Sequence, residues 1–255
     1  MSATPHTGGK LSGQVAIITG ASSGIGRAIT LAFLGEGADL VVVARRAERL
    51  ADLEREASAR GRRCVSVVGD TTEEKTALRA VAAATESLGR LDILVNNVGM
   101  AHYKPLAETS AAEYDEMMNT NMRSTFLFTR HAVPVLLARR KGLILTVSSM
   151  AGVMGFAGES VYCATKFAQV GFTQALDREL RPHGIKVGAI CPGGVKTEFA
   201  IGTGRTEEGV AASGMLEADD VAAAALLMAT QPPESRIMEI RMRPMVEPLA
   251  GRDPE

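Results

Sequence analysis

The chain has 255 residues, enough to bury a substantial core and within the range of a single α/β domain. Its 28 basic and 29 acidic side chains give a formal net charge of -1, which excludes wholesale attraction to nucleic acid or to an anionic membrane and favours a small-molecule partner. Its 3 cysteines are widely spaced, which argues against a disulfide framework and a zinc site and indicates a reducing, cytoplasmic environment.

The N-terminal residues are rich in Ser, Thr and Gly and lack the apolar stretch of a signal peptide. No apolar run approaches the roughly 18 residues that a membrane span needs. We therefore predict a soluble, cytoplasmic protein with a flexible tail over 1–10, a single domain over 11–243 and a C-terminal tail over 244–255.

Short apolar runs alternate with longer amphipathic segments along the chain. The apolar runs predict strands at Val15–Thr19, Leu40–Ala44, Arg63–Val68, Ile93–Asn96, Gly142–Val147, Lys186–Ile190 and Arg236–Met242. The amphipathic segments predict helices at Gly24–Gly35, Arg46–Arg60, Glu73–Leu88, Ser110–Asn119, Arg123–Arg139, Ser160–Arg181 and Glu217–Thr230. This alternation predicts an α/β fold, a doubly wound (Rossmann) seven-stranded parallel sheet with helices on both faces and a ligand crevice at the carboxyl ends of its strands.

A glycine-rich turn joins the first predicted strand to the first predicted helix, within the sequence Thr19-Gly20-Ala21-Ser22-Ser23-Gly24-Ile25-Gly26. A glycine-rich turn alone could be an ordinary tight turn. Its place at a helix N-terminus after a buried strand instead favours a site where backbone N–H groups bind a pyrophosphate. We predict that this cofactor site includes Gly20, Ser22, Ser23, Gly24, Ile25 and Gly26.

Two arginines, Arg45 and Arg46, follow the second predicted strand, where an enzyme that uses NAD would place a carboxylate on the ribose. Guanidinium groups suit the additional 2′-phosphate of NADP. The alternative is a pair of ordinary surface arginines, although cations are poorly placed at a helix N-terminus unless an anion compensates them. The sequence therefore predicts that NADP(H) is preferred over NAD(H).

Polar residues also end the third and fourth predicted strands. Asp70, next to Thr71, could accept a hydrogen bond from an adenine amino group, or could cap the helix that begins near Glu73. Asn96 and Asn97 could each tie neighbouring strand ends together, and we expect that role for Asn96.

Tyr162 and Lys166 lie four residues apart and therefore share one face of a predicted helix. An ordinary tyrosine has a pKa of about 10, and a lysine charge about 5 Å away favours the phenolate by about 3 kcal/mol, or about two pKa units. The pair could equally be part of a solvated helix face.

Taken together and in order, these motifs resemble those of the short-chain dehydrogenase/reductase family over about residues 11–243. The resemblance covers the glycine turn, Asp70, the segment Asn96–Gly99 with Val98 in place of the family's alanine, and Pro192–Thr197. It implies a catalytic tetrad of Asn121, Ser149, Tyr162 and Lys166. It also implies cofactor contacts from Thr71, Asn97, Val98, Gly99, Tyr162, Lys166, Pro192, Gly193, Val195 and Thr197.

The resemblance further implies a role for each member of the tetrad. Tyr162 would exchange a proton with the substrate, and Lys166 would hold the cofactor's ribose and lower the tyrosine pKa. Ser149 would donate a hydrogen bond to the carbonyl oxygen, and Asn121 would position a water that links Lys166 to solvent. Taken singly, Ser149 could be a turn residue, Asn121 a cap between two helices and Tyr162 a core residue.

The expected reaction is NADPH-dependent, reversible reduction of a ketone or aldehyde carbonyl. One alternative is a 3-oxoacyl-carrier-protein reductase, and an alternative of another class is a non-catalytic dinucleotide-binding regulatory protein. We expect a lid over 198–214 and a substrate pocket formed by Ser149, Met100, Met154, Phe156 and Phe199. No motif fixes an arginine for a substrate carboxylate.

Family members commonly pair two long helices, here Arg123–Arg139 and Ser160–Arg181, with symmetry mates, so the resemblance implies a homodimer or homotetramer. The segment from Ile237 to Met245 departs from the paired-glycine ending of many members.

Overall fold

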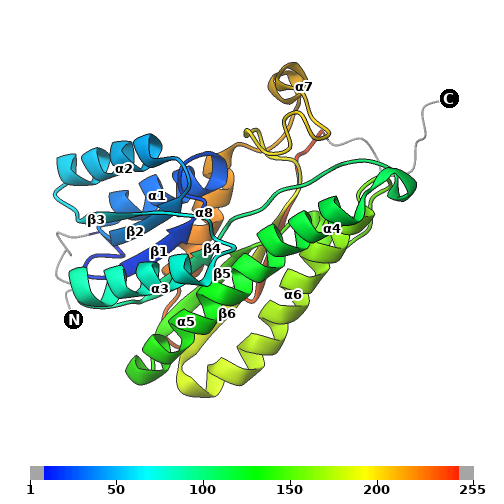
Figure 1. Cartoon of the computed structure of the whole chain (residues 1–255). Helices are drawn as coiled ribbons and strands as arrows, with labels where there is room; N and C mark the ends of the chain where they lie inside the picture. Colours follow the sequence, from blue (N-terminus) through cyan, green and yellow to red (C-terminus); the bar gives the residue numbers. More distant parts are fainter. Residues whose placement is uncertain (1–8, 247–255) are drawn as a thin grey trace.

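The structure, a computed structural model, describes residues 9–246 and contains one parallel sheet between two layers of helices (Figure 1). Across the sheet, the strands lie in the order β3 (Cys64–Val68), β2 (Asp39–Ala44), β1 (Val15–Thr19), β4 (Ile93–Asn96), β5 (Gly142–Val147), β6 (Ile185–Pro192) and β7 (Glu239–Met242). All neighbouring strands pair in parallel, so the predicted fold class is confirmed.

The helices are α1 (Gly24–Gly35), α2 (Ala47–Ala59), α3 (Glu74–Ala82), α4 (Ala111–Met118), α5 (Ser124–Arg139), α6 (Ser160–Leu180), α7 (Glu207–Ala212) and α8 (Ala218–Ala229). No helix among residues 9–246 is long and apolar enough to cross a membrane. The tails predicted at 1–10 and 244–255 lie mostly outside the described residues.

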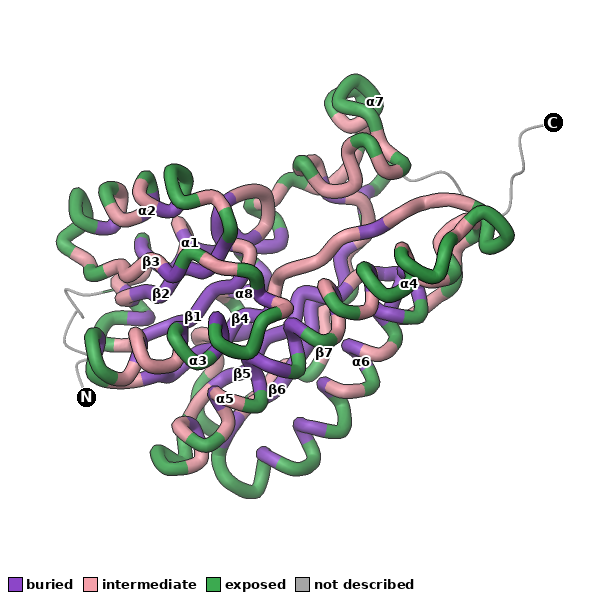
Figure 2. Tube along the Cα trace, in the orientation of Figure 1, coloured by how far each residue is buried: buried purple, intermediate pink, exposed green. Residues whose placement is uncertain are grey.

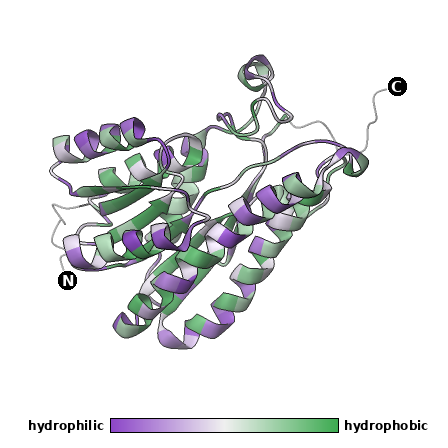
Figure 3. Ribbon diagram, viewed as in Figure 1, coloured by the Kyte–Doolittle hydropathy of each residue, from purple (hydrophilic) through white to green (hydrophobic). Residues whose placement is uncertain are grey.

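Alternate residues of each strand enter two separate cores, one on each face of the sheet. Ile18 packs with α1, α2 and α8, whereas its neighbour Ile17 packs with α3, α5 and α6. The strands are therefore apolar on both faces, which explains their unbroken runs of aliphatic residues (Figures 2 and 3). Each buried isoleucine contributes about 1.5–3 kcal/mol relative to exposure.

A turn of π-helix, η3 (Asn119–Arg123), joins α4 to α5 where the sequence predicted a break between two helices. Asn121 lies in this turn with no exposed surface, so the alternative interpretation of Asn121 as a cap between two helices is wrong, because the helical segment is continuous. Such turns add one residue to the helix and frequently occur at functional sites.

Other predicted boundaries need small corrections. The predicted helix Glu73–Leu88 ends in a second π-turn, η1 (Ala83–Ser87), and β7 is shorter than the predicted Arg236–Met242. Arg236 donates from Nε to Asp177 Oδ1 of α6 at 2.8 Å and lies before the β6–β7 ladder. Helix α7 was missed because it is short and buries no residue, so it carries no apolar periodicity.

The strand order places a crevice at one edge of the sheet. From β1 the chain builds outward through β2 and β3, then crosses back to β4 on the other side of β1. Loops at the carboxyl ends of β1 and β4 therefore diverge and leave space for a ligand between them.

Candidate active site

A cavity of about 1220 Å³ opens at the carboxyl ends of the strands. It is lined by almost all of the residues predicted to bind the cofactor: Gly20, Ser22, Ser23, Gly24, Ile25, Arg45, Arg46, Asp70, Thr71, Asn97, Val98, Gly99, Tyr162, Lys166, Pro192, Gly193, Val195 and Thr197. Segments far apart in the sequence thus meet at the predicted crevice.

The glycine turn is closely packed against its surroundings. Gly20 and Gly24 have φ angles of 66° and 49°, in the left-handed region that favours glycine. Gly26 does not line the cavity, but a Cβ at this position would lie 2.2 Å from the Gly20 carbonyl oxygen. Glycine is therefore required at position 26 so that α1 can approach the turn.

Arg46 lies across this turn. Its guanidinium donates to Ser23 Oγ at 2.6 Å and to Ser22 Oγ at 3.1 Å, and Nη1 pairs with Glu198 Oε2 at 2.8 Å. Arg45 is exposed at the cavity edge, whereas Arg49 pairs with the other oxygen of Glu198. Glu198 thus supplies the anion that a cation at the start of α2 requires.

The alternative role of Asp70 as a helix cap and the role expected for Asn96 are both wrong. Asp70 does not cap α3, because its Oδ1 accepts from the backbone N–H and the hydroxyl of Thr72, both at 2.8 Å. These contacts, the backbone bond first, lower the pKa of the Asp70 carboxyl. Asn96 donates to Thr129 of α5, and Asn97 is the residue that ties strand ends, donating to the Thr19 carbonyl at 3.0 Å.

The four residues of the predicted tetrad come together from three elements. Ser149 follows β5, and its Oγ accepts from Ala151 N at 3.1 Å and donates to the Pro192 carbonyl at 3.5 Å. Its hydroxyl is close enough to Tyr162 to lower the pKa of that phenol. Lys166 Nζ lies 5.8 Å from the centre of the Tyr162 ring, and both residues are buried. Asn121 holds the loop after β4, accepting from Met100 N at 2.8 Å and donating to the Met100 carbonyl at 2.9 Å.

Burial dominates the electrostatics of the pair. It raises the pKa of Tyr162 well above its ordinary value, an effect only partly offset by the hydrogen bond with Ser149. Burial likewise lowers the pKa of Lys166 to about 8. The predicted lowering of the tyrosine pKa by the lysine charge is therefore wrong for the protein without its cofactor, because desolvation of the phenolate dominates and the groups that offset it are Ser149 and Arg205.

Gln169 completes the surroundings of Lys166 and was missed from the sequence. Its Oε1 accepts from Lys166 Nζ at 2.9 Å, and its Nε2 donates to the Asn121 carbonyl at 2.8 Å and to Thr125 Oγ1 at 2.9 Å. Lys166 Nζ also donates to the Val147 carbonyl at 3.3 Å. A glutamine in an amphipathic helix resembles a surface residue in sequence, and only its three-residue spacing from Lys166 hinted at contact.

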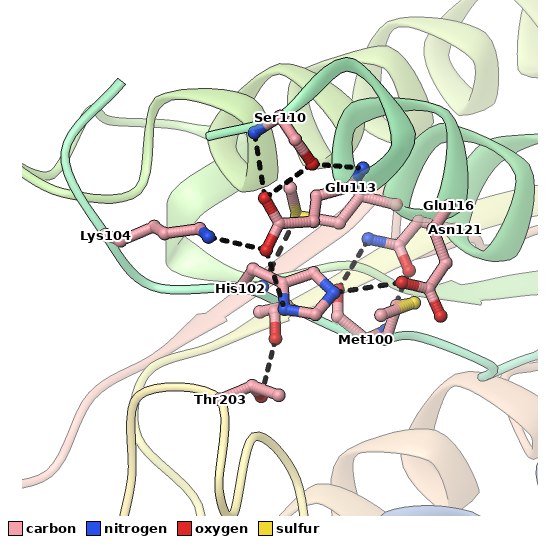
Figure 4. A network of polar contacts seen from close by, with 10 residues as sticks. Met100, His102, Lys104, Ser110, Glu113, Glu116, Asn121 and Thr203 are labelled. Carbon is pink, nitrogen blue, oxygen red and sulfur yellow. Dashed lines mark hydrogen bonds and ion pairs between the residues drawn. The ribbon is translucent and has the colours of Figure 1, made fainter. Parts of the chain in front are cut away.

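Polar contacts fix the loop between β4 and α4 (Figure 4). His102 Nε2 lies 3.0 Å from Glu116 Oε2, and Lys104 Nζ pairs with Glu113 Oε1 at 2.5 Å. Glu113 also forms a capping box with Ser110 at the start of α4. The loop is thereby attached to the helix that leads into Asn121.

The substrate end of the cavity is aromatic. The rings of Tyr103 and Phe199 lie 5.6 and 5.8 Å from the ring of Tyr162, centre to centre. Of the predicted substrate residues, Ser149, Met100, Phe156 and Phe199 line the cavity, whereas Met154 does not. Tyr103 and Arg205 are among the lining residues outside the predicted substrate pocket.

Comparisons with known proteins point in one direction. A family model described as short chain dehydrogenase matches residues 14–208. Oxidoreductase UcpA of Escherichia coli (strain K12) is 39% identical over 195 residues, which cover 75% of this chain and 73% of that protein. Among solved structures, a metagenomic short-chain oxidoreductase in complex with NADP has 33% identity and a TM-score of 0.80, covering 93% of this chain and 100% of that one.

A relative of different size is glycine betaine reductase ATRR of Emericella nidulans, 36% identical over 252 residues. The match covers 96% of this chain but only 20% of that protein, so this chain spans about a fifth of its length. The named activity therefore belongs to a much longer protein.

The buried ammonium of Lys166 predicts a pH-dependent stability. Because its pKa falls from 10.5 in the unfolded chain to about 8 in the folded one, the folded state releases this proton first. Stability therefore rises with pH between about 8 and 10.5, by up to about 3 kcal/mol. Lys166→Met lacks this contribution.

Urea denaturation of the wild type and of Lys166→Met across pH 7 to 10.5 measures this pH-dependent contribution to stability. The free energy of unfolding of the wild type minus that of the variant is expected to increase with pH. The constant part of the difference is not diagnostic, because the variant also leaves Gln169 without its partner. If the free energies of unfolding of the wild type and the variant change with pH in parallel, burial does not lower the pKa of Lys166.

Proposed function

The chain belongs to the short-chain dehydrogenase family, and on this basis we propose that it is an NADPH-dependent oxidoreductase that reversibly reduces a ketone or aldehyde carbonyl to an alcohol. The observation that carries the proposal is one cavity that contains both the glycine turn and the buried Ser149, Tyr162 and Lys166. Carbonyl reduction needs a dinucleotide site and a proton donor within reach of each other, and these residues offer both.

The residues fit a dinucleotide. A Cβ at Gly24 would lie 2.9 Å from Thr197 Cγ2, and one at Gly20 would lie 2.9 Å from Asn97 Nδ2, so the turn has room only for bare backbone. Backbone N–H groups at the start of α1 suit a pyrophosphate. Bound there, NADPH would supply the hydride.

In this mechanism, Tyr162 donates its proton to the carbonyl oxygen as negative charge develops there. A raised pKa keeps the phenol protonated at neutral pH, which suits a donor in the direction of reduction. Ser149 donates a hydrogen bond to the same oxygen, and Lys166 binds the ribose hydroxyls of the cofactor. Asn121 fixes the loop at Met100 and so holds one wall of the site.

Arg46, supported by Arg45, would bind the 2′-phosphate of NADP. Arg46 already lies across Ser22 and Ser23, and its partner Glu198 is an anion in the place where a phosphate would compete for it. The NADP complex of a structural relative agrees with this preference.

The proposed carbonyl reduction has two alternative functions. A 3-oxoacyl-carrier-protein reductase would use the same residues, whereas a regulatory dinucleotide-binding protein would not need the Ser149–Tyr162 contact. We also propose a homodimer or homotetramer, because Phe126 of α5 and Phe167 of α6, on the two long helices expected to pair between subunits, are 45% and 47% exposed. Other apolar residues of these helices contribute less to such a surface, because Val133 and Phe172 are partly buried and Val170 belongs to the core. The free cysteines support the proposal of a cytoplasmic location.

Tyr162→Phe tests the proton donor. It removes the phenolic hydroxyl while keeping the buried ring, so we expect kcat for carbonyl reduction to fall at least a hundredfold. NADPH affinity, measured by fluorescence titration, should change less than threefold. The assay is NADPH oxidation with a panel of ketones, aldehydes and 3-oxoacyl thioesters; near-normal turnover by the variant would exclude Tyr162 as the acid.

Arg46→Asp and Arg45→Asp test the cofactor preference. Each places a carboxylate where the 2′-phosphate would bind, so the ratio of the NADPH to the NADH dissociation constant should rise at least tenfold, more for Arg46. Arg49→Asp is the matched control, because Arg49 also pairs with Glu198 but does not line the cavity. A ratio that changes equally in all three variants would rule out specific phosphate recognition.

A further inference from the structure

The substrate end of the cavity carries an arginine, Arg205, that forms no salt bridge among the described residues, although it interacts electrostatically with the carboxylate of Glu159. Arg205 lines the cavity, and within residues 9–246 its guanidinium makes no hydrogen bond or ion pair. The other cations at the cavity wall include Arg46, paired with Glu198, and Lys166, hydrogen-bonded to Gln169. An unpaired guanidinium inside a cavity is available to an anionic ligand.

The backbone holds Arg205 in this place. A tight turn from Ala200, which has a φ of 62°, closes with a hydrogen bond from Arg205 N to the Ala200 carbonyl at 2.9 Å. Thr203 docks the turn on the loop after β4, donating to the Ala101 carbonyl at 2.8 Å and accepting from Tyr103 N at 2.9 Å. These three hydrogen bonds fix the position of the Arg205 backbone relative to that loop.

The guanidinium lies against two aromatic rings. Arg205 Cζ is 5.7 Å from the ring centres of both Tyr103 and Phe199, and both rings contact the ring of Tyr162. A cation within about 6 Å of an aromatic ring centre is attracted to the ring, so the two rings favour this position of the guanidinium. Each of these two rings thus contacts both the Arg205 guanidinium and the ring of Tyr162, the proposed proton donor.

We infer that Arg205 binds a carboxylate of the substrate, so that the preferred substrate is an oxo acid whose carboxylate is several bonds from the reacting carbonyl. The inference rests on the proposed function and names its substrate class. A carboxylate matches the guanidinium fork and carries a single charge. Glu159 also lines the cavity, and its carboxylate interacts electrostatically with Arg205, so it disfavours a ligand of higher negative charge.

Matched pairs of oxo acids and their methyl esters test the inference, with NADPH as the cofactor. The wild type should prefer the acid at least tenfold in kcat/KM. Arg205→Gln should lower kcat/KM for the acid at least tenfold, mainly through KM, and change that for the ester less than threefold. Arg205→Lys should recover part of the acid preference, and Glu159→Gln should shift the preference further toward the acid.

The possible outcomes distinguish a failure of this inference from a failure of the proposed function. If the wild type reduces acids and esters equally, or if Arg205→Gln affects both equally, Arg205 does not bind a substrate carboxylate, although carbonyl reduction stands. If the wild type reduces no member of the panel while binding NADPH, the proposed function itself fails.

A second, independent observation concerns Gln169. Its side-chain amide bridges Lys166 Nζ and the Asn121 carbonyl, and Thr125 saturates its second N–H. The family resemblance implied a water that Asn121 positions next to the lysine. Here the Asn121 carbonyl accepts from Gln169 Nε2 and from Thr125 Oγ1, both at 2.8 Å, and the Gln169 amide connects this carbonyl to Lys166 Nζ.

We propose that Gln169 is a positioning residue that holds Lys166 Nζ toward the ribose site and favours its charged form. An amide oxygen accepts a hydrogen bond from an ammonium but does not exchange protons with it at neutral pH. The other titratable groups near Lys166 are Tyr162 on α6 and Cys191 on β6. Burial raises the pKa of the Cys191 thiol to about 11, so it does not replace Gln169 as a counter-charge.

The pH dependence of kcat/KM for carbonyl reduction distinguishes positioning from mere packing. Gln169→Met removes the acceptor, so the alkaline limb should move to lower pH by at least half a unit and KM for NADPH should rise. Gln169→Glu keeps the shape but adds an anion, so the same limb should move to higher pH. Gln174→Met, at an exposed position of the same helix, should leave the profile unchanged.

Shifts of opposite sign in the two Gln169 variants are the expected result. A uniform loss of activity at every pH, or shifts of the same sign, would overturn the assignment and leave Gln169 as a packing residue. If Gln169→Met does not fold, Gln169→Glu alone decides. Only electrostatic coupling to Lys166 moves the alkaline limb of its kcat/KM profile to higher pH.

Discussion

A buried ammonium organises the active side of this molecule. Lys166 is almost without solvent contact, and burying an unpaired charge is strongly unfavourable, so its donors must find acceptors within the protein. Val147 at the end of β5 and Gln169 on α6 provide them, and Gln169 is in turn held by the π-turn that contains Asn121. The lysine therefore ties the sheet edge, α6 and the α4–α5 junction together, and the cavity takes its shape from that connection.

The features of this arrangement that depend only on neighbouring residues in the chain could be predicted from the sequence. Aliphatic runs such as Val15–Thr19 are buried on both faces and have no other stable role, so the strands and the parallel sheet followed from them. The glycine turn was also predictable, because left-handed φ angles at Gly20 and Gly24 and the close approach at Gly26 require residues without a Cβ.

Side-chain partners could not be predicted, because they depend on distances between elements. Asn96 and Asn97 are identical in chemistry and adjacent in sequence, yet successive side chains of a strand point to opposite faces. Asn96 therefore bonds to α5 and Asn97 to β1. The direction of the Tyr162 pKa was also wrong, since a charge four residues away was visible in the sequence but the depth of burial was not.

The segment from Glu198 to Arg205 connects the two halves of the cavity. Glu198 pairs with Arg46 and Arg49 on the side of the glycine turn, whereas Phe199 and Arg205 contact the aromatic group around Tyr162. The 2′-phosphate proposed to bind Arg46 would compete with Glu198, which directly precedes Phe199 in the chain. Because exposed ion pairs are individually weak, the Arg46–Glu198 pair would oppose that exchange only slightly. One short backbone segment therefore contributes side chains to both the cofactor half and the substrate half of the cavity.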